Sequence, residues 1–192
     1  MFINGKSDAL HPSLRSAIFR IVISANGEEE FGALQEQFGK TTSVDGKEII
    51  LQSLGQVANS ELANKYLDFL FSPEVAVQDI HSGASTLAAN PKTRRALWDY
   101  IRTNWDLIVY PKLSSNMVVL DRFLRITLTT FANDAVAGEI KDFFKSKDNT
   151  GYDRSLGVIQ DSIKSNAAYR ERDSEALREW LSAHGYLGLK AD

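Results

Sequence analysis

Hydrophobic residues recur along most of this chain every three or four positions, the spacing of a helix with one buried face. Near the N-terminus, four apolar side chains share such a face: Leu14, Ile18, Ile21 and Val22. Pro12 suits the first helical position, where a missing N–H costs nothing. We therefore expect a helix over residues 12–22 with this apolar face turned inward.

The same spacing continues almost to the C-terminus, and no segment alternates as a half-buried strand would. Acidic residues at positions 28–30 favour a helix start. Residues 120–144 form two amphipathic segments broken at Asn133. We expect only a short helix and a loop over residues 78–89. Elsewhere the pattern predicts helices over residues 28–38, 50–57, 60–70, 97–108, 119–128, 134–144, 156–167 and 173–184.

The last expected helix begins at Asp173, a suitable N-cap residue. Its predicted inner side consists of Leu177, Trp180, Leu181 and His184. The aromatic residues at helical spacing favour core packing over a ligand groove; they are Trp98, Trp105, Phe143, Phe144 and Trp180.

Short polar turns separate these helices, and helices joined in this way tend to pack antiparallel. Stacked antiparallel pairs give a curved solenoid. No clean repeat is visible, and the loop over residues 145–151 is too short to link independent domains. The expected fold is all-α, an irregular HEAT- or armadillo-like superhelical array of antiparallel helix pairs in a single domain over residues 1–192.

Composition excludes several classes of function. The net charge of -3 argues against a nucleic-acid-binding surface. No apolar run reaches the roughly 20 residues that cross a bilayer, so we expect no membrane partner. The chain has no cysteine, which removes disulfides and thiolate chemistry and is compatible with the cytoplasm.

Catalytic motifs are missing from this sequence. Zinc peptidase chemistry uses a His-Glu-x-x-His pattern on a helix, but the three histidines are scattered. We expect His11 to cap a helix and His184 to pack at a helix end, while His81 falls in a predicted loop. No serine-nucleophile elbow or glycine-rich phosphate loop is present. The sequence therefore predicts no catalytic residue and no metal ligand, and it disfavours a small independent hydrolase.

Arg122 is the one charged residue that stands out. Its neighbours on the expected helix face are Val118, Val119 and Ile126. A cation on an apolar face needs a partner or a wet cavity. Two interpretations stay open: an ion pair with a carboxylate of the next helix, or a cation that meets an anionic or carbonyl group of a ligand.

Segments in a fixed order resemble the C-terminal helical domain of zinc aminopeptidases of the puromycin-sensitive type, which carry His-Glu-x-x-His elsewhere. The stretch Asp121-Arg-Phe-Leu-Arg125 is one of them, and Gly151-Tyr-Asp-Arg-Ser-Leu156 is most similar to fungal cytosolic members. The others are residues 11–19, 51–56, 74–80, 96–106, 137–144 and 166–173.

The resemblance implies a larger enzyme with two β domains, a thermolysin-like catalytic domain that binds zinc, and this helical domain capping the active site. It also implies that Arg122 faces the substrate cavity. The implied partners are the parent's catalytic domain and peptide substrates, and the implied location is cytoplasmic.

The predicted function is therefore the non-catalytic C-terminal domain of a zinc metallo-aminopeptidase that removes N-terminal residues from peptides. The isolated domain should expose an apolar or charged surface that met the catalytic domain, which makes self-association possible. The alternative is a stand-alone helical adaptor that binds another protein along its groove.

Overall fold

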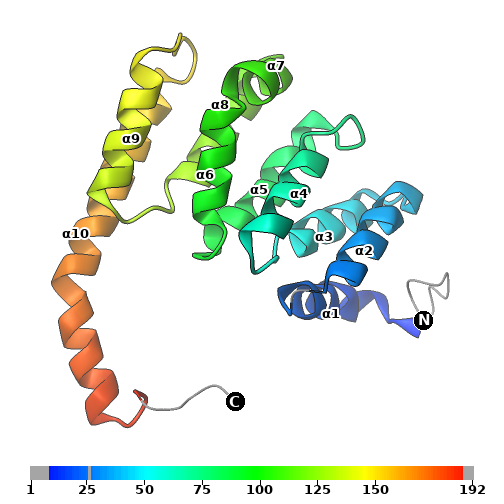
Figure 1. Cartoon of the computed structure of the whole chain (residues 1–192), viewed down its shortest axis with the longest axis horizontal. Helices are drawn as coiled ribbons and strands as arrows, with labels where there is room; N and C mark the ends of the chain where they lie inside the picture. The colour runs from blue at the N-terminus through cyan, green and yellow to red at the C-terminus, as the bar shows by residue number, and fades with distance from the viewer. Residues whose placement is uncertain (1–8, 26, 188–192) are drawn as a thin grey trace.

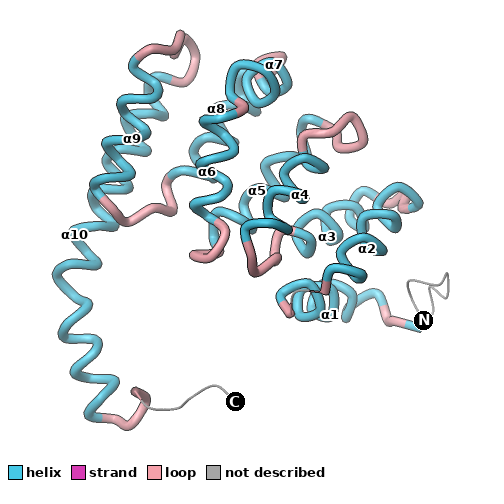
Figure 2. The backbone as a smooth tube through the Cα atoms, in the orientation of Figure 1, coloured by secondary structure: helices cyan, strands magenta, loops and turns pink. Residues whose placement is uncertain are grey.

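The computed structural model describes residues 9–25 and 27–187, and within these residues it contains helices and loops but no strand (Figures 1 and 2). The all-α prediction is confirmed. Residues 1–8, 26 and 188–192 of the expected single domain lie outside the described residues. The helices are α1 (Pro12–Ser24), α2 (Glu28–Lys40), α3 (Val44–Leu54), α4 (Ser60–Leu70), α5 (Ile80–Ala89), α6 (Arg94–Thr103), α7 (Tyr110–Leu113), α8 (Met117–Leu128), α9 (Asp134–Lys145) and α10 (Asp153–Ala183).

The helices pack in two layers that follow one another in an arc from α1 to α10 (Figure 1). In the first layer, α1 contacts α3, α3 contacts α5, α5 contacts α8, and α8 contacts α10. The second layer comprises α2, α4, α6 and α9; α2 packs on α3, α4 on α5 and α6, and α9 on α10. Each pair buries its apolar stripes between the layers, as expected for stacked helix pairs.

An aromatic cluster holds α6, α9 and the start of α10 together. The ring of Trp105 lies edge-on to Phe144 at 5.0 Å, and Trp98 lies edge-on to Phe143 at 5.5 Å. Trp98, Trp105 and Phe144 are buried and Phe143 is half-buried. The expectation that these four residues are core is confirmed. Asn133 caps α9 by accepting a hydrogen bond from the N–H of Ala135 at 2.8 Å, so the predicted break is confirmed as well.

Residues 80–89 form the complete helix α5, so the prediction of a short helix and a loop here was wrong. Its glycine, serine and threonine residues have low helix propensity, but burial between α3, α4 and α8 outweighs that preference. A Cβ atom on Gly83 would lie 2.2 Å from Tyr66 Oη and 2.7 Å from Leu70 Cδ1. Glycine at this position therefore permits α5 to approach α4 closely.

The expected inner face of α1 was wrong. Leu14, Ile18 and Ile21 are exposed, Ile21 by 67%, whereas Phe19 and Ile23 are buried. The helical period alone did not indicate which of the two apolar stripes meets α3. His11 does cap the helix, accepting a hydrogen bond from the N–H of Ser13 through Nδ1 at 3.3 Å, as predicted.

The C-terminal prediction was also wrong, because α10 is one helix of 31 residues and Asp173 lies inside it. No glycine or proline interrupts residues 158–184, so the helix continues past the predicted boundary. Asp173 instead pairs with Arg172, whose Nε lies 2.6 Å from Asp173 Oδ1. Leu177 and Trp180, which were expected inside, are 57% and 51% exposed. His184 does lie at the helix end, as expected.

We expect Gly83→Ala to lower the free energy of unfolding by about 1–3 kcal/mol, because the new methyl group displaces the buried Tyr66 or Leu70 side chain. Gly138→Ala in α9 is the matched control, since a Cβ atom there meets nothing within 4 Å. That change should raise stability by about 0.5–1 kcal/mol through helix propensity. Urea unfolding measures both. Equal effects of the two substitutions would contradict close packing at Gly83.

Candidate functional site

A chain of hydrogen-bonded side chains crosses the surface of the first layer. Arg20 of α1 donates from Nη2 to Gln52 Oε1 of α3 at 2.9 Å. Gln52 Nε2 in turn donates to Glu48 Oε1 at 3.1 Å and to Ser82 Oγ of α5 at 3.2 Å. Ser82 Oγ donates to the same Glu48 oxygen at 3.0 Å. These four residues, which we call the polar ladder, fix three helices of the first layer relative to one another.

His81 and Arg122 continue this polar surface from α5 to α8. The pKa of His81 lies below its ordinary value, mainly because the imidazole is partly buried and then because of the positive charge of Arg122. Asp79 and Glu48 act in the opposite direction but are weaker. The lowered pKa favours the neutral imidazole at pH 7, and the positive charge of Arg122 on α8 contributes to this shift.

Arg122 is exposed on α8, and among the described residues it makes no ion pair and no side-chain hydrogen bond. An ion pair with the next helix, one of the two interpretations of its position, is thus not observed in this part of the chain. Arg122 instead lines a surface hollow of about 460 Å³ between α8 and α10. The apolar members of this lining include Val118, Ile126 and Val158.

A second hollow of about 590 Å³ adjoins the first and shares Val118, Asp121, Arg125 and Val158 with it. We call the two together the α8–α10 groove. Arg122 and Arg125 line the first hollow, and Arg154 adds a further guanidinium in the second. Guanidinium groups beside aliphatic side chains suit a ligand that presents a carboxylate or carbonyl oxygen next to an apolar group. The groove can therefore bind and orient an extended ligand.

The described residues offer no cluster for a metal ion. No group of three or more His, Asp, Glu or Cys side chains lies at metal-binding spacing between residues 9 and 187, with residue 26 left aside. His11 lies at the start of α1, His81 at the start of α5 and His184 at the end of α10. The described residues thus do not fit a zinc site of the type that the resemblance places in the catalytic domain.

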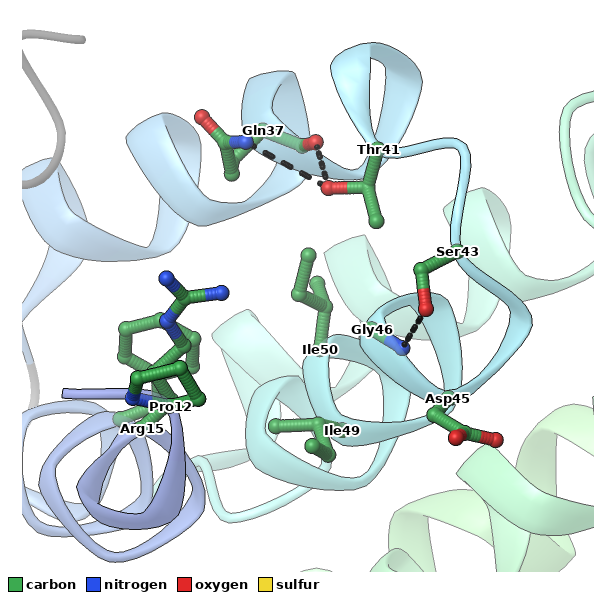
Figure 3. Close-up of a pocket in the computed structure, with 10 residues that line it drawn as sticks. Pro12, Arg15, Gln37, Thr41, Ser43, Asp45, Gly46, Ile49 and Ile50 are labelled. Carbon is green, nitrogen blue, oxygen red and sulfur yellow. Dashed lines mark hydrogen bonds between the residues drawn. The ribbon is translucent and has the colours of Figure 1, made fainter. Parts of the chain in front are cut away.

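A smaller pocket of about 220 Å³ lies between α1, the end of α2 and the start of α3 (Figure 3). Arg15 and Asp45 lie on opposite sides of it. The hydroxyl groups in this pocket form hydrogen bonds with the ends of helices. Thr41 Oγ1 donates to the carbonyl of Gln37 in α2 at 2.8 Å, and Ser43 Oγ accepts from the N–H of Gly46 in α3 at 3.3 Å. We therefore assign this pocket a structural role.

Sequence reasoning identified Arg122 but missed the polar ladder and His81. Glu48 and Gln52 are four residues apart on α3, a spacing that places them together on one helix face. This spacing could have been read from the sequence. Their pairing with Ser82 required knowing that residues 80–89 form a helix against α3.

None of the helices in the described ranges is both long and apolar enough to cross a bilayer.

Comparisons with known proteins find sequence relatives over almost the whole chain. The sequence model of the family described as "ERAP1-like C-terminal domain" matches residues 1–165. Aminopeptidase 2 of Candida albicans is 30% identical over 186 residues, which is 96% of this chain and 20% of that protein. The mitochondrial Aminopeptidase 2 of Saccharomyces cerevisiae is 28% identical over 96% of the chain, and Aminopeptidase N of Canis lupus familiaris is 24% identical over 93%. The chain spans about a fifth of the length of these relatives.

We expect Arg122→Met to raise the pKa of His81, because the substitution removes a nearby positive charge that disfavours the imidazolium. The value should stay below that of an ordinary histidine, since burial is the larger cause. Arg125→Met, one turn further along α8, is the control and should leave His81 unchanged. An NMR titration of the three imidazoles measures this. An unchanged His81 in Arg122→Met would show that the two side chains do not interact.

Proposed function

Since the chain belongs to the ERAP1-like C-terminal domain family, we propose that it is the C-terminal helical domain of a zinc metallo-aminopeptidase, of the puromycin-sensitive type and close to fungal cytosolic members. In the parent enzyme this domain, residues 1–192, caps the active site and forms one wall of the chamber that holds the peptide. The zinc ion and its ligands belong to the parent's catalytic domain, and the location is the cytoplasm. The names of the relatives, all aminopeptidases, support the proposal.

The observation that supports this proposal is the position of Arg122 on an exposed surface beside a groove. It lies on the first-layer surface beside His81, lines the α8–α10 groove, and has no carboxylate partner among the described residues. A cation without an internal partner is available to a ligand. We therefore assign Arg122 to the substrate-facing side of the domain, where it binds a carbonyl or carboxylate oxygen of the distal part of the peptide.

The exposed face of α1 supports the proposed partner. Leu14, Ile18 and Ile21 form an apolar stripe at the N-terminal edge of the array. End units of stable helix arrays carry a polar outer face, so an apolar outer face indicates a contact with further protein. In the parent enzyme this stripe packs against another part of the same polypeptide.

The isolated chain should not catalyse peptide hydrolysis. We expect no sustained turnover when the purified chain is mixed with zinc and an aminoacyl-anilide, because the described residues supply neither a metal cluster nor a nucleophile–base pair. The parent enzyme under the same conditions is the positive control. Turnover that survives repeated purification would refute this assignment.

We expect Arg122→Met in the parent enzyme to raise KM for long peptides by about 10- to 100-fold, since a lost charge-assisted hydrogen bond costs about 1.5–3 kcal/mol. Hydrolysis of an aminoacyl-anilide, which is too short to reach the groove, should be unchanged. Lys40→Met on α2 is a charge-matched control in the second layer.

Equal effects of Arg122→Met on short and long substrates would contradict a role for Arg122 in binding the distal peptide. A parent protein without aminopeptidase activity, but with a protein ligand that competes for the α8–α10 groove, would instead support the adaptor alternative.

A further inference from the structure

The α8–α10 groove concentrates positive charge on a chain that is acidic overall. The chain carries 25 acidic and 22 basic residues, yet three arginines and a single carboxylate, that of Asp121, line the groove. Arg122 and Arg125 come from α8, and Arg154 comes from the first turn of α10. All three arginines are exposed. The groove therefore has a local excess of positive charge, which attracts an anionic ligand.

The charged side chains of the groove do not neutralise one another. Asp121 and Arg125 are four residues apart on α8, a spacing that often brings opposite charges together. None of the ion pairs in the described part of the chain, however, includes Asp121 or any of the three arginines. The guanidinium groups therefore keep their N–H donors for a ligand.

The spacing of these arginines fits the side chains of an extended peptide. Arg122 and Arg125 are three residues apart, so their Cβ atoms lie about 5–6 Å from each other on one side of α8. In an extended chain, side chains that point to one side are two residues apart, which is roughly 6.7 Å. Two acidic residues separated by one other residue can therefore meet both arginines at once. Arg154, on the α10 side of the second hollow, can meet a third carboxylate.

The groove offers more donors than a terminal carboxylate can use. One carboxylate has two oxygens and satisfies one guanidinium in the bidentate arrangement, so three arginines suit a ligand with several carboxylates. On the basis of the proposed function, we propose that the groove selects peptides whose distal part carries acidic side chains at alternate positions. Arg125 and Arg154 then determine this preference together with Arg122.

The composition of the groove favours an exchangeable peptide over a permanent contact with the rest of the polypeptide. Permanent protein contacts are rich in apolar surface. Among the described residues, the exposed apolar side chains larger than valine lie outside the groove, for example Ile21 on α1 and Trp180 on α10. A permanent cover would remove three guanidinium groups from water, which is costly unless each receives an anion. A peptide that binds and leaves meets them in a groove that stays open to water.

Two matched peptides test this preference in the parent enzyme. Each has about nine residues, roughly 30 Å when extended, and they differ only in Glu-Ala-Glu or Gln-Ala-Gln in the distal half. An amidated C-terminus leaves side chains as the source of distal negative charge. We expect KM to be at least about fivefold lower for the Glu peptide, because hydrogen bonds to charged groups are the stronger ones. The ratio of the two KM values should fall at high salt.

Substitutions in the groove locate the preference. Arg125→Met and Arg154→Met should each lower the KM ratio at least about twofold with little change in kcat, since binding is what they remove. Asp121→Asn should raise the ratio, because it removes the one opposing charge. Arg178→Met is the matched control, since Arg178 is an exposed arginine of α10 outside the groove. That variant should keep the parent ratio. Circular dichroism checks that each variant keeps its helix content.

Equal KM values for the two peptides, or a ratio that Arg125→Met and Arg154→Met leave unchanged, would overturn the acidic preference. If Arg122→Met still raised KM for both peptides alike, the proposed function would stand and only the acidic preference would fail. If no groove substitution changed KM for either peptide, both would fail.

Calorimetric titration of the isolated chain with the same two peptides tests the choice of occupant. We expect the Glu peptide to bind more tightly than the Gln peptide, as in the parent enzyme. Tighter binding of the Glu peptide to the isolated chain, with equal KM values in the parent enzyme, would show that the rest of the polypeptide covers the groove. That result would overturn the proposal as well.

Discussion

The close packing of α5 between α3 and α8 is the constraint on which the rest of the structure depends. α5 contacts both neighbours of the first layer, and it also packs on α4 and α6 in the second. Gly83 permits the close approach of α5 to α4, and the Tyr66 hydroxyl of α4 that occupies the space beside it donates to the carbonyl of Leu51 in α3 at 2.7 Å. Burial raises the pKa of Tyr66 far above its ordinary value, so the hydroxyl is protonated and can donate this bond at neutral pH.

This packing also creates the candidate site. Because α5 lies so near α3, Ser82 reaches Glu48 and Gln52, and the polar ladder forms. Because α5 lies so near α8, His81 meets the charge of Arg122. Burial and that charge favour the neutral imidazole at pH 7. Within the described part of the chain, Arg122 has no carboxylate partner, and it lines the α8–α10 groove.

The sequence predicted the helical class, the break at Asn133 and most of the aromatic core, because these depend on local periodicity and capping. The sequence predictions were wrong where burial or helix length depends on contacts with other helices. The four-residue spacing in α1 could not indicate which apolar stripe meets α3, and Leu14 and Ile21 proved to be exposed. Low helix propensity around Gly83 concealed α5. At α10, an N-cap candidate and an apolar stripe suggested a separate buried helix, whereas the chain continues as one helix past its last contacts with the array. Arg122 could be singled out by its apolar neighbours, but that it forms no ion pair with any described residue could be seen only once the positions of α5 and α10 were known.

The central claim is that the first layer, and the α8–α10 groove in particular, faces the peptide in the parent enzyme. Photo-crosslinking tests it most directly: a peptide with a photoreactive group near its C-terminus is bound to the parent enzyme, irradiated and mapped by mass spectrometry. The claim predicts labels on α8 and on the part of α10 that lines the groove, with competition by unlabelled peptide. Labels confined to α2, α4, α6 and α9, or none within this domain, would contradict it.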